Sequence, residues 1–137
     1  MKITLYTDGA CRGNPGPGGY AAILTATNTQ GELLREIEVT GGEPETTNNR
    51  MEIRAVIEGL NAIKQPSTVE IVSDSQYVIY TMTRNWKRKA NLDLWDQLDD
   101  AIKRHTIRWR YVKGHAGHDY NERCDKLAVA AASQFQK

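Results

Sequence analysis

The sequence predicts an α/β domain in which helices cover both faces of a five-stranded mixed sheet. The chain begins with strand patterns, changes to helical periodicity, and then reaches two further strands through helices. A strand reached through a helix normally runs parallel to a neighbour, so two parallel crossovers are expected after an antiparallel meander. The length of 137 residues suits one hydrophobic core, and residues 1–137 are therefore expected to form a single domain.

The first three expected strands form the meander. They span residues 3–7, 20–26 and 33–40, and in the third strand Ile37 and Val39 alternate with polar residues. An Asn-Thr-Gln-Gly turn joins the second strand to the third. Short connections of this kind favour antiparallel pairing.

The remaining elements alternate helices with strands. Apolar residues recur at helical spacing from about residue 48 to residue 64, and Pro66 ends that helix. A fourth strand covers residues 69–73 and leads into a short helix from Ser75. The last expected elements are a helix entered near Asn91, a strand at residues 107–111 and a helix from about Asn121.

The composition is that of an ordinary globular protein, with 39% hydrophobic and 26% charged residues. No apolar run approaches the roughly 20 residues that span a bilayer, and Met1 leads directly into the first strand. We therefore expect a monomeric, cytoplasmic protein without membrane association. Cys11 and Cys124 are too few for a disulfide framework and are expected to be free thiols.

The net charge of +1 argues against nucleic-acid binding through bulk charge, but basic residues gather in two places. One cluster surrounds Trp86 within residues 84–89, and the other surrounds Trp109 within residues 103–113. Solvated faces of a helix and a strand are the commoner explanation for such clusters. The tryptophan inside each cluster favours a nucleic-acid surface somewhat.

Two aspartates follow neighbouring strands of the expected sheet. Asp8 ends the first strand and Asp74 ends the fourth, so parallel pairing would place both carboxylates at one sheet edge. Each also has a purely structural explanation. Asp74 would suit the N-cap of the next helix, and Asp8 would accept hydrogen bonds in its own Gly-rich turn.

Two further acids fall at expected helix starts. Glu52 follows Asn49 at the spacing of a capping box, and Asp125 lies where a negative charge suits the helix dipole. Taken together, the four acids can converge at one edge. Carboxylates without a cysteine cluster suit a hard cation such as Mg²⁺, and without a metal they would repel one another.

Two histidines lie in the loop before the last helix. His115 and His118 flank glycine residues, and Cys124 follows in the helix. Three readings stay open: exposed loop histidines, a zinc site with Cys124, or a histidine that moves protons near bound metal.

Six short blocks together are similar to the bacterial-type ribonuclease H family, type 1. They lie at residues 7–9, 13–20, 47–52, 73–78, 112–118 and 121–125 and occur in the family's order. The resemblance covers essentially the whole chain and implies the ribonuclease-H-like fold. It also implies an endonuclease that cuts the RNA strand of RNA–DNA hybrids and leaves 5′-phosphate and 3′-hydroxyl ends.

The resemblance assigns roles to residues of this chain. Asp8, Glu52, Asp74 and Asp125 match the family's metal-binding acids, which hold two Mg²⁺ ions, with Mn²⁺ as an alternative. His115 matches an assisting histidine. The positions that match hybrid-binding residues are Cys11, Asn14, Thr47, Asn48, Asn49, Gln76, Trp86 and Lys87. The Gly-rich stretch after Asp8 is expected to let a nucleic-acid backbone approach the metals.

The segment between Trp86 and Trp95 is shorter here than in many relatives. We therefore expect weaker or more salt-sensitive hybrid binding than in relatives with a longer basic segment. Two other functions stay open, a hybrid-binding module without catalysis and a nuclease of the same superfold that acts on DNA. A similar domain also ends some reverse transcriptases, and the sequence does not distinguish these origins.

Overall fold

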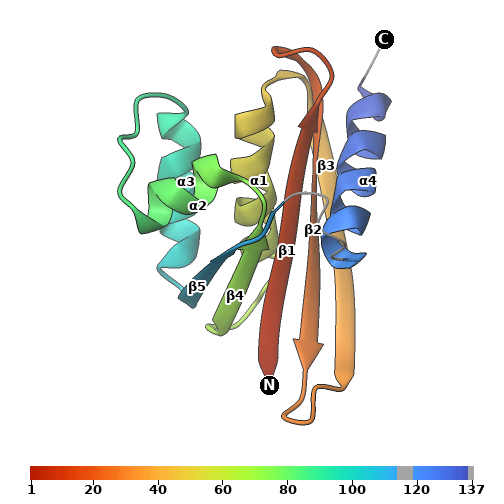
Figure 1. Ribbon diagram of the computed structural model, residues 1–137, viewed down its shortest axis with the longest axis vertical. Helices are drawn as coiled ribbons and strands as arrows, with labels where there is room; N and C mark the ends of the chain where they lie inside the picture. Colours follow the sequence, from red (N-terminus) through yellow and green to blue (C-terminus); the bar gives the residue numbers. More distant parts are fainter. Residues whose placement is uncertain (114–118, 136–137) are drawn as a thin grey trace.

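The structure is a computed structural model that describes residues 1–113 and 119–135. Five strands form one sheet in the order β3-β2-β1-β4-β5 (Figure 1). The elements are β1 (Lys2–Cys11), β2 (Gly16–Thr27), β3 (Leu33–Thr46), α1 (Asn48–Asn61), β4 (Thr68–Ser73), α2 (Gln76–Thr83), α3 (Leu92–Ile102), β5 (Thr106–Tyr111) and α4 (Asp119–Gln134). Pairing is antiparallel in β1–β2–β3 and parallel in β1–β4–β5, which confirms the predicted mixed sheet.

Helices cover both faces of the sheet, as predicted. Helices α1, α2 and α3 lie on one side and α4 lies on the other (Figure 1). Side chains of β1 alternate between the two faces, so Leu5 joins the larger core under α1 while Tyr6 packs against Cys124 and Ala128 of α4. None of the helices in the described part of the chain is long and apolar enough to cross a membrane.

The first two strands are longer than the sequence predicts. Their ladder continues from Asp8–Ala21 to the last pair, Cys11–Gly18, so Asp8 lies inside β1 and not at its end. The β1–β2 turn is confined to residues 12–15. Pro17 is tolerated in a strand with two neighbours because the β2–β3 register shifts at this residue, where its missing N–H breaks no regular ladder bond.

Glycines of this stretch serve helix packing. A Cβ atom on Gly19 would lie 2.3 Å from the carbonyl oxygen of Ala128 and 2.4 Å from the nitrogen of Ala132, so α4 packs directly on the backbone of β2. Gly9 has the same relation to α1, because a Cβ there would lie 2.5 Å from the nitrogen of Glu52. Gly9 and Gly19 therefore allow helices to pack against the strand backbone. The sequence analysis expected this stretch to be a loop that a nucleic acid could approach.

Three helix starts also differ from the expectation. Helix α1 is capped by Thr47, whose hydroxyl accepts a hydrogen bond from Arg50 N, and Asn49 is not the cap. Ser75 caps α2, so Asp74 lies outside the cap position. Helix α4 begins at Asp119 rather than Asn121, which moves Asp125 out of the first turn. Ser, Thr, Asn and Asp all cap helices well, so composition alone does not select among neighbours.

Replacing Gly19 by alanine should destabilise the protein by about 3 kcal/mol, the upper range for overpacking, because backbone atoms of α4 cannot rotate away from a new Cβ. Gly31→Ala is the matched control. It adds the same methyl group where no atom lies within 4 Å and costs only the strain of its positive φ, about 1 kcal/mol. Urea unfolding measures both free energies. A smaller loss for Gly19→Ala than for Gly31→Ala would contradict the packing role.

Candidate active site

The sheet register brings Asp8 and Asp74 together. Strands β1 and β4 pair in parallel up to Tyr6–Val72, and extending this register by two residues sets Asp8 beside Asp74. Strand β4 ends at Ser73, whereas β1 continues to Cys11. The sheet edge therefore opens beside Asp8, at the carboxyl end of the parallel strands.

Glu52 reaches the same point from helix α1. Because Gly9 has no side chain, α1 lies close enough to β1 for Glu52 to meet the carboxylate of Asp8. One carboxylate oxygen from each of Asp8, Glu52 and Asp74 can be chosen so that all three lie within 4.8 Å of one another. Asp8 is 8% exposed and Glu52 is 6% exposed, so these charges are largely withdrawn from water.

Burial and mutual repulsion raise the pKa values in this cluster. Burial raises the pKa of Asp8 to about 7, and the negative charge of Asp74 adds to the effect. Gly9 N donates a hydrogen bond of 2.9 Å to Asp8 Oδ1 and partly offsets the shift. Burial, followed by the charges of Asp8 and Asp74, raises the pKa of Glu52 well above its usual range. Without a cation, protons take up part of the negative charge.

The cluster fits a hard divalent cation. Its donors are all carboxylate oxygens, which Mg²⁺ and Mn²⁺ prefer. Glu52 Oε1 is buried and has no hydrogen-bond partner among the described residues. A buried acceptor without a partner costs free energy, which a bound cation would recover. The residues present therefore suit the metal that the sequence predicts.

Asp125 lies near this cluster without being part of the tight group of three. Its charge contributes to the raised pKa of Asp8, although burial and Asp74 contribute more. Two contacts hold the start of α4 in place: Tyr120 stacks on Tyr6 with ring centroids 4.6 Å apart, and Arg123 pairs with Glu38 at 2.6 Å. His115 lies outside the described residues.

Cys124 does not suit the zinc site that the sequence left open. The side chain is completely buried, and its Sγ donates to the carbonyl oxygen of Tyr6 at 3.4 Å. Burial raises the pKa of the Cys124 thiol to about 12, which opposes the thiolate that zinc requires. Both cysteines are free thiols, as expected.

Several expected hybrid-binding residues meet at one corner. Asn14, in the β1–β2 turn, accepts a hydrogen bond of 3.1 Å from Asn48 N at the start of α1. Cys11 Sγ lies 3.3 Å from the carbonyl oxygen of Thr46, one residue before the cap Thr47. These contacts bring the β1–β2 turn, the end of β3 and the start of α1 together into one surface. The sequence pattern does not predict that these three segments meet.

Two more residues of the set belong to the same side of the site. Asn49 is exposed in the first turn of α1. Gln76 follows Asp74 by two residues and donates from Nε2 to the hydroxyl of Tyr111 at 3.3 Å. Their amides therefore lie beside the elements that carry the carboxylates.

Trp86 and Lys87 lie in the connection between α2 and α3. Trp86 is 45% exposed and contacts the Tyr80 ring edge-on, while Lys87 is exposed. The basic cluster around Trp86 is less free than its sequence suggests, because Arg88 forms an ion pair of 2.7 Å with Asp99 of α3. Eleven residues separate these partners, and no local pattern predicts the pair.

Arg50 is a second residue whose role the sequence does not reveal. From α1 it pairs with Asp93 at 2.7 Å and donates to Asn91 Oδ1 at 3.3 Å. These bonds tie the start of α1 to the start of α3. Hydrogen bonding to Arg50 lowers the pKa of Asp93 to about 2. Arg50 therefore supports the helix that carries Glu52.

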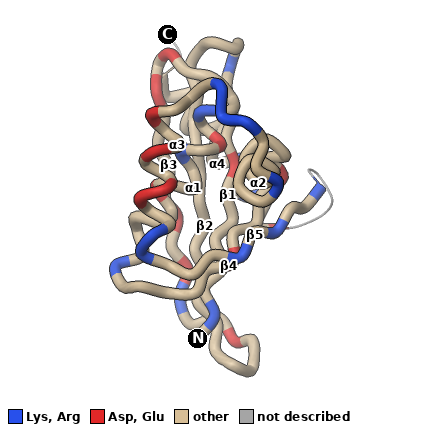
Figure 2. The backbone as a smooth tube through the Cα atoms, turned by 90° about the vertical axis from the view of Figure 1, so that its left-hand side faces the viewer, with Lys and Arg blue, Asp and Glu red and all other residues tan. Residues whose placement is uncertain are grey.

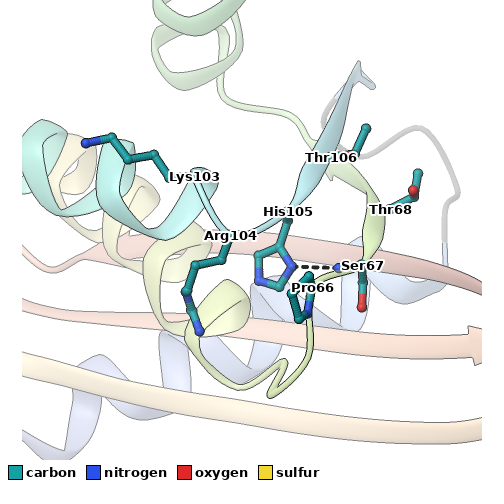
Figure 3. A pocket seen from close by; sticks show the side chains of 7 residues that line it. All are labelled: Pro66, Ser67, Thr68, Lys103, Arg104, His105 and Thr106. Carbon is teal, nitrogen blue, oxygen red and sulfur yellow. Dashed lines mark hydrogen bonds between the residues drawn. The ribbon is translucent and has the colours of Figure 1, made fainter.

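A separate hollow lies at the opposite end of the parallel strands. It is formed by the connections that lead into β4 and β5, and His105 stands at its centre (Figure 3). His105 Nδ1 accepts a hydrogen bond from Ser67 N at 3.1 Å, and Arg104 donates to Asn61 Oδ1 at 3.0 Å. These polar side chains join the two connections and are distant from the carboxylates.

A mixed sheet of this strand order, with acidic side chains at the open end of its central parallel strands, defines the ribonuclease-H-like class of α/β proteins. A family model described as RNase H matches residues 1–133. The chain belongs to the ribonuclease H family and is a type 1 member.

Relatives of known name support the same assignment. The chain is 49% identical to ribonuclease H of Rhodopirellula baltica, over 97% of this chain and 92% of that protein. It is 50% identical to ribonuclease H of Nitrobacter hamburgensis, over 92% of this chain and 88% of that protein. The first alignment runs over 149 residues, more than the 137 of this chain, so that relative carries segments without a counterpart here.

Two solved structures show the same fold. LC9-RNase H1, described as a type 1 RNase H with the type 2 active-site motif, matches with a TM-score of 0.84 and 35% identity over 98% of this chain and 73% of that chain. LC11-RNase H1, solved in complex with an RNA/DNA hybrid, matches with a TM-score of 0.77 and 26% identity over 97% of this chain and 98% of that chain.

Removal of divalent cations should make stability fall as pH rises. The pKa of Asp8 is higher in the folded protein than in the unfolded chain, so its contribution is complete below about pH 4 and is lost as pH rises through about 7. Added Mg²⁺ should therefore raise Tm more at about pH 8 than at about pH 5. Thermal unfolding with and without EDTA measures this difference.

Asp8→Asn should remove much of this pH dependence and of the Mg²⁺ effect. Asp96→Asn, on the exposed face of α3, makes the same chemical change outside the cluster and should behave as wild type. Equal Mg²⁺ stabilisation in wild type and Asp8→Asn would show that the cation binds elsewhere.

Proposed function

We propose that this chain is an endonuclease that hydrolyses the RNA strand of RNA–DNA hybrids and leaves 5′-phosphate and 3′-hydroxyl ends. The observation that carries the proposal is the close group of Asp8, Glu52 and Asp74 in a chain of the ribonuclease H family. The similar LC11-RNase H1 was solved with an RNA/DNA hybrid, which supports the same substrate here.

The acids of the site would hold two Mg²⁺ ions, or Mn²⁺ in their place. Asp8, Glu52 and Asp74 supply the closely spaced oxygens, and Asp125 adds a fourth carboxylate from α4. When bound, such ions activate a water molecule and stabilise the leaving oxygen of a phosphodiester. Gly9 N holds Asp8 Oδ1 in one orientation, which favours a fixed direction for the other oxygen.

Amide side chains beside the carboxylates would recognise the hybrid. Asn14, Asn48, Asn49 and Gln76 lie on the turn and helix starts that surround the site. Amides can donate to and accept from a 2′-hydroxyl, the group that distinguishes RNA from DNA. Cys11 lies at the same corner and would contact the same strand.

The other strand of the hybrid would contact two further places. Thr47 stands at the start of α1, where backbone N–H groups favour an anion such as a phosphate. Trp86 and Lys87 offer an aromatic face and a positive charge in the α2–α3 connection. We further propose that the enzyme acts as a cytoplasmic monomer.

A substrate panel tests the proposed activity. Labelled RNA–DNA hybrid, duplex DNA, duplex RNA and both single strands are incubated with the protein and Mg²⁺, and product ends are mapped. Cleavage restricted to the RNA of the hybrid is expected. Cleavage of duplex DNA would favour a DNA-acting nuclease of the same fold, and tight hybrid binding without cleavage would favour a binding module.

Asp8→Asn should reduce hybrid cleavage by more than about 100-fold. Loss of a residue that only supports a metal ligand costs up to roughly 100-fold in activity, and this change alters a ligand itself. The near-equal side-chain volume should leave the fold intact, which circular dichroism checks. Asp96→Asn, exposed on α3, again serves as the control and should retain the wild-type rate. Wild-type turnover in Asp8→Asn would remove Asp8 from the catalytic site.

His115→Ala should slow turnover about 100-fold without abolishing it, since proton transfer by one side chain contributes at this scale. Single-turnover cleavage of labelled hybrid measures the chemical step. His118→Ala controls for changes to the loop and should have the smaller effect. Complete loss of cleavage in His115→Ala, or an unchanged rate, would contradict an assisting role.

A further inference from the structure

The sheet face that carries α4 is only half covered. Helix α4 packs on β1, β2 and β3, and no helix of residues 1–113 or 119–135 packs on this face of β4 and β5 (Figure 1). Strand β5 alternates in consequence. Ile107 and Trp109 pack into the core under α1, whereas Arg108 and Arg110 are exposed on the opposite face.

Three cations of this open face surround one acid, Glu70. Lys2 of β1 and Arg110 of β5 approach Glu70 of β4 at 3.7 and 3.8 Å, and Arg108 is opposite Glu70 in the sheet register. Both ion-pair distances are long, and the side chains of Lys2 and Arg110 are 62% and 58% exposed. Three cations beside one carboxylate carry a net positive charge, and β5 appears as a basic strand in Figure 2.

The register continues from these cations to the carboxylate site. Tyr6, Val72 and Arg110 form one row across β1, β4 and β5, two residues before the row of Asp8. Because side chains alternate along a strand, this row lies on the same sheet face as Asp8. Measured along the strand direction, the row of Arg110 is ~7 Å from the row of Asp8, and the row of Arg108 is ~13 Å from it.

The open face is also hollowed. A cavity of about 340 Å³ is lined by Lys2, Thr68, Glu70 and Arg108 among others. A second cavity of about 500 Å³ lies beside it over β1 and β2, toward the start of α4, and Lys2, Thr4 and Tyr6 are among its lining residues. Lys2 lines both. Ammonium, guanidinium and hydroxyl groups are the side-chain donors that contact phosphate oxygens.

We propose that Lys2, Arg108 and Arg110, here named the open-face cations, bind phosphates of the RNA strand that continues from the carboxylate site. This inference rests on the proposed function, because the strand at the carboxylates is the one to be cut. The RNA strand is favoured over the DNA strand because the open-face cations and Asp8 share one face and successive rows. The α2–α3 connection of this chain is short, and the open-face cations offer a second contact to the nucleic acid on a different side of the carboxylates.

The test measures the salt dependence of binding for three substrates. In an Asp8→Asn background, which prevents cleavage, a short blunt hybrid is compared with the same hybrid carrying single-stranded RNA extensions at either end. Each phosphate contact to a single strand contributes about 0.7 to the slope of log K against log salt. Arg108→Gln with Arg110→Gln should lower the slope by about 1.4 for one of the extended substrates and leave the blunt hybrid unchanged.

Matched variants separate this surface from a general charge effect. Lys64→Gln with Lys103→Gln removes the same charge from exposed residues outside the open face and should change no slope. Glu70→Gln removes the competing carboxylate and should tighten binding of the extended substrate. If the double arginine variant fails to fold, Lys2→Gln should lower the slope by about 0.7.

The outcomes distinguish this inference from the proposed function. Cleavage of the blunt hybrid with wild-type Asp8 and the open-face variants should proceed at the wild-type rate. Normal cleavage with unchanged slopes for both extended substrates would overturn the open-face contact alone. Failure of the unmodified protein to cut any hybrid would overturn the proposed function.

Discussion

The concentration of negative charge at Asp8, Glu52 and Asp74 is the constraint on which the site depends. Their oxygens lie within 4.8 Å of one another, and two of the residues are buried, so the folded state must oppose both repulsion and desolvation. The raised pKa of Asp8, about 7, reports that opposition. A site arranged in this way is stable only if its supports are rigid or a cation is present, and here the backbone supplies the rigidity.

Three features of the fold hold the acids in place. The parallel β1–β4 register sets Asp8 beside Asp74, and it is fixed by the burial of Leu5, Val69 and Ile71 on the face under α1. Gly9 allows α1 to lie against β1, and Arg50 joins α1 to α3 through Asp93. These supports come from different elements. A perturbation of one therefore leaves the others to hold part of the site, whereas loss of the Gly9 approach displaces Glu52 directly.

The sequence predicted the order of the elements and the mixed pairing of the sheet better than the boundaries of the elements. Hydrophobic periodicity reports which face of an element is buried, and this revealed the meander, the crossovers and both helical layers. It failed between Gly9 and Gly19 because glycine and proline are typical of turns, whereas here they lie in paired strands under two helices. The capping error at Asn49 has a similar origin, since adjacent Thr and Asn residues are equivalent by composition. Contacts such as Arg88–Asp99 depend on the tertiary fold and have no local signal.

The arrangement of charge, rather than its total, determines where this molecule could attract a polyanion. A net charge of +1 conceals a separation in which α3 is acidic while β5 and the α2–α3 connection are basic (Figure 2). Some cations are neutralised internally, as Arg50 is by Asp93 and Arg88 by Asp99. Lys2, Arg108 and Arg110 are among the cations that remain exposed, and they lie on the half-sheet that no described helix covers. A polyanion would therefore meet positive potential around a negatively charged centre, and cation binding at that centre would remove the local repulsion.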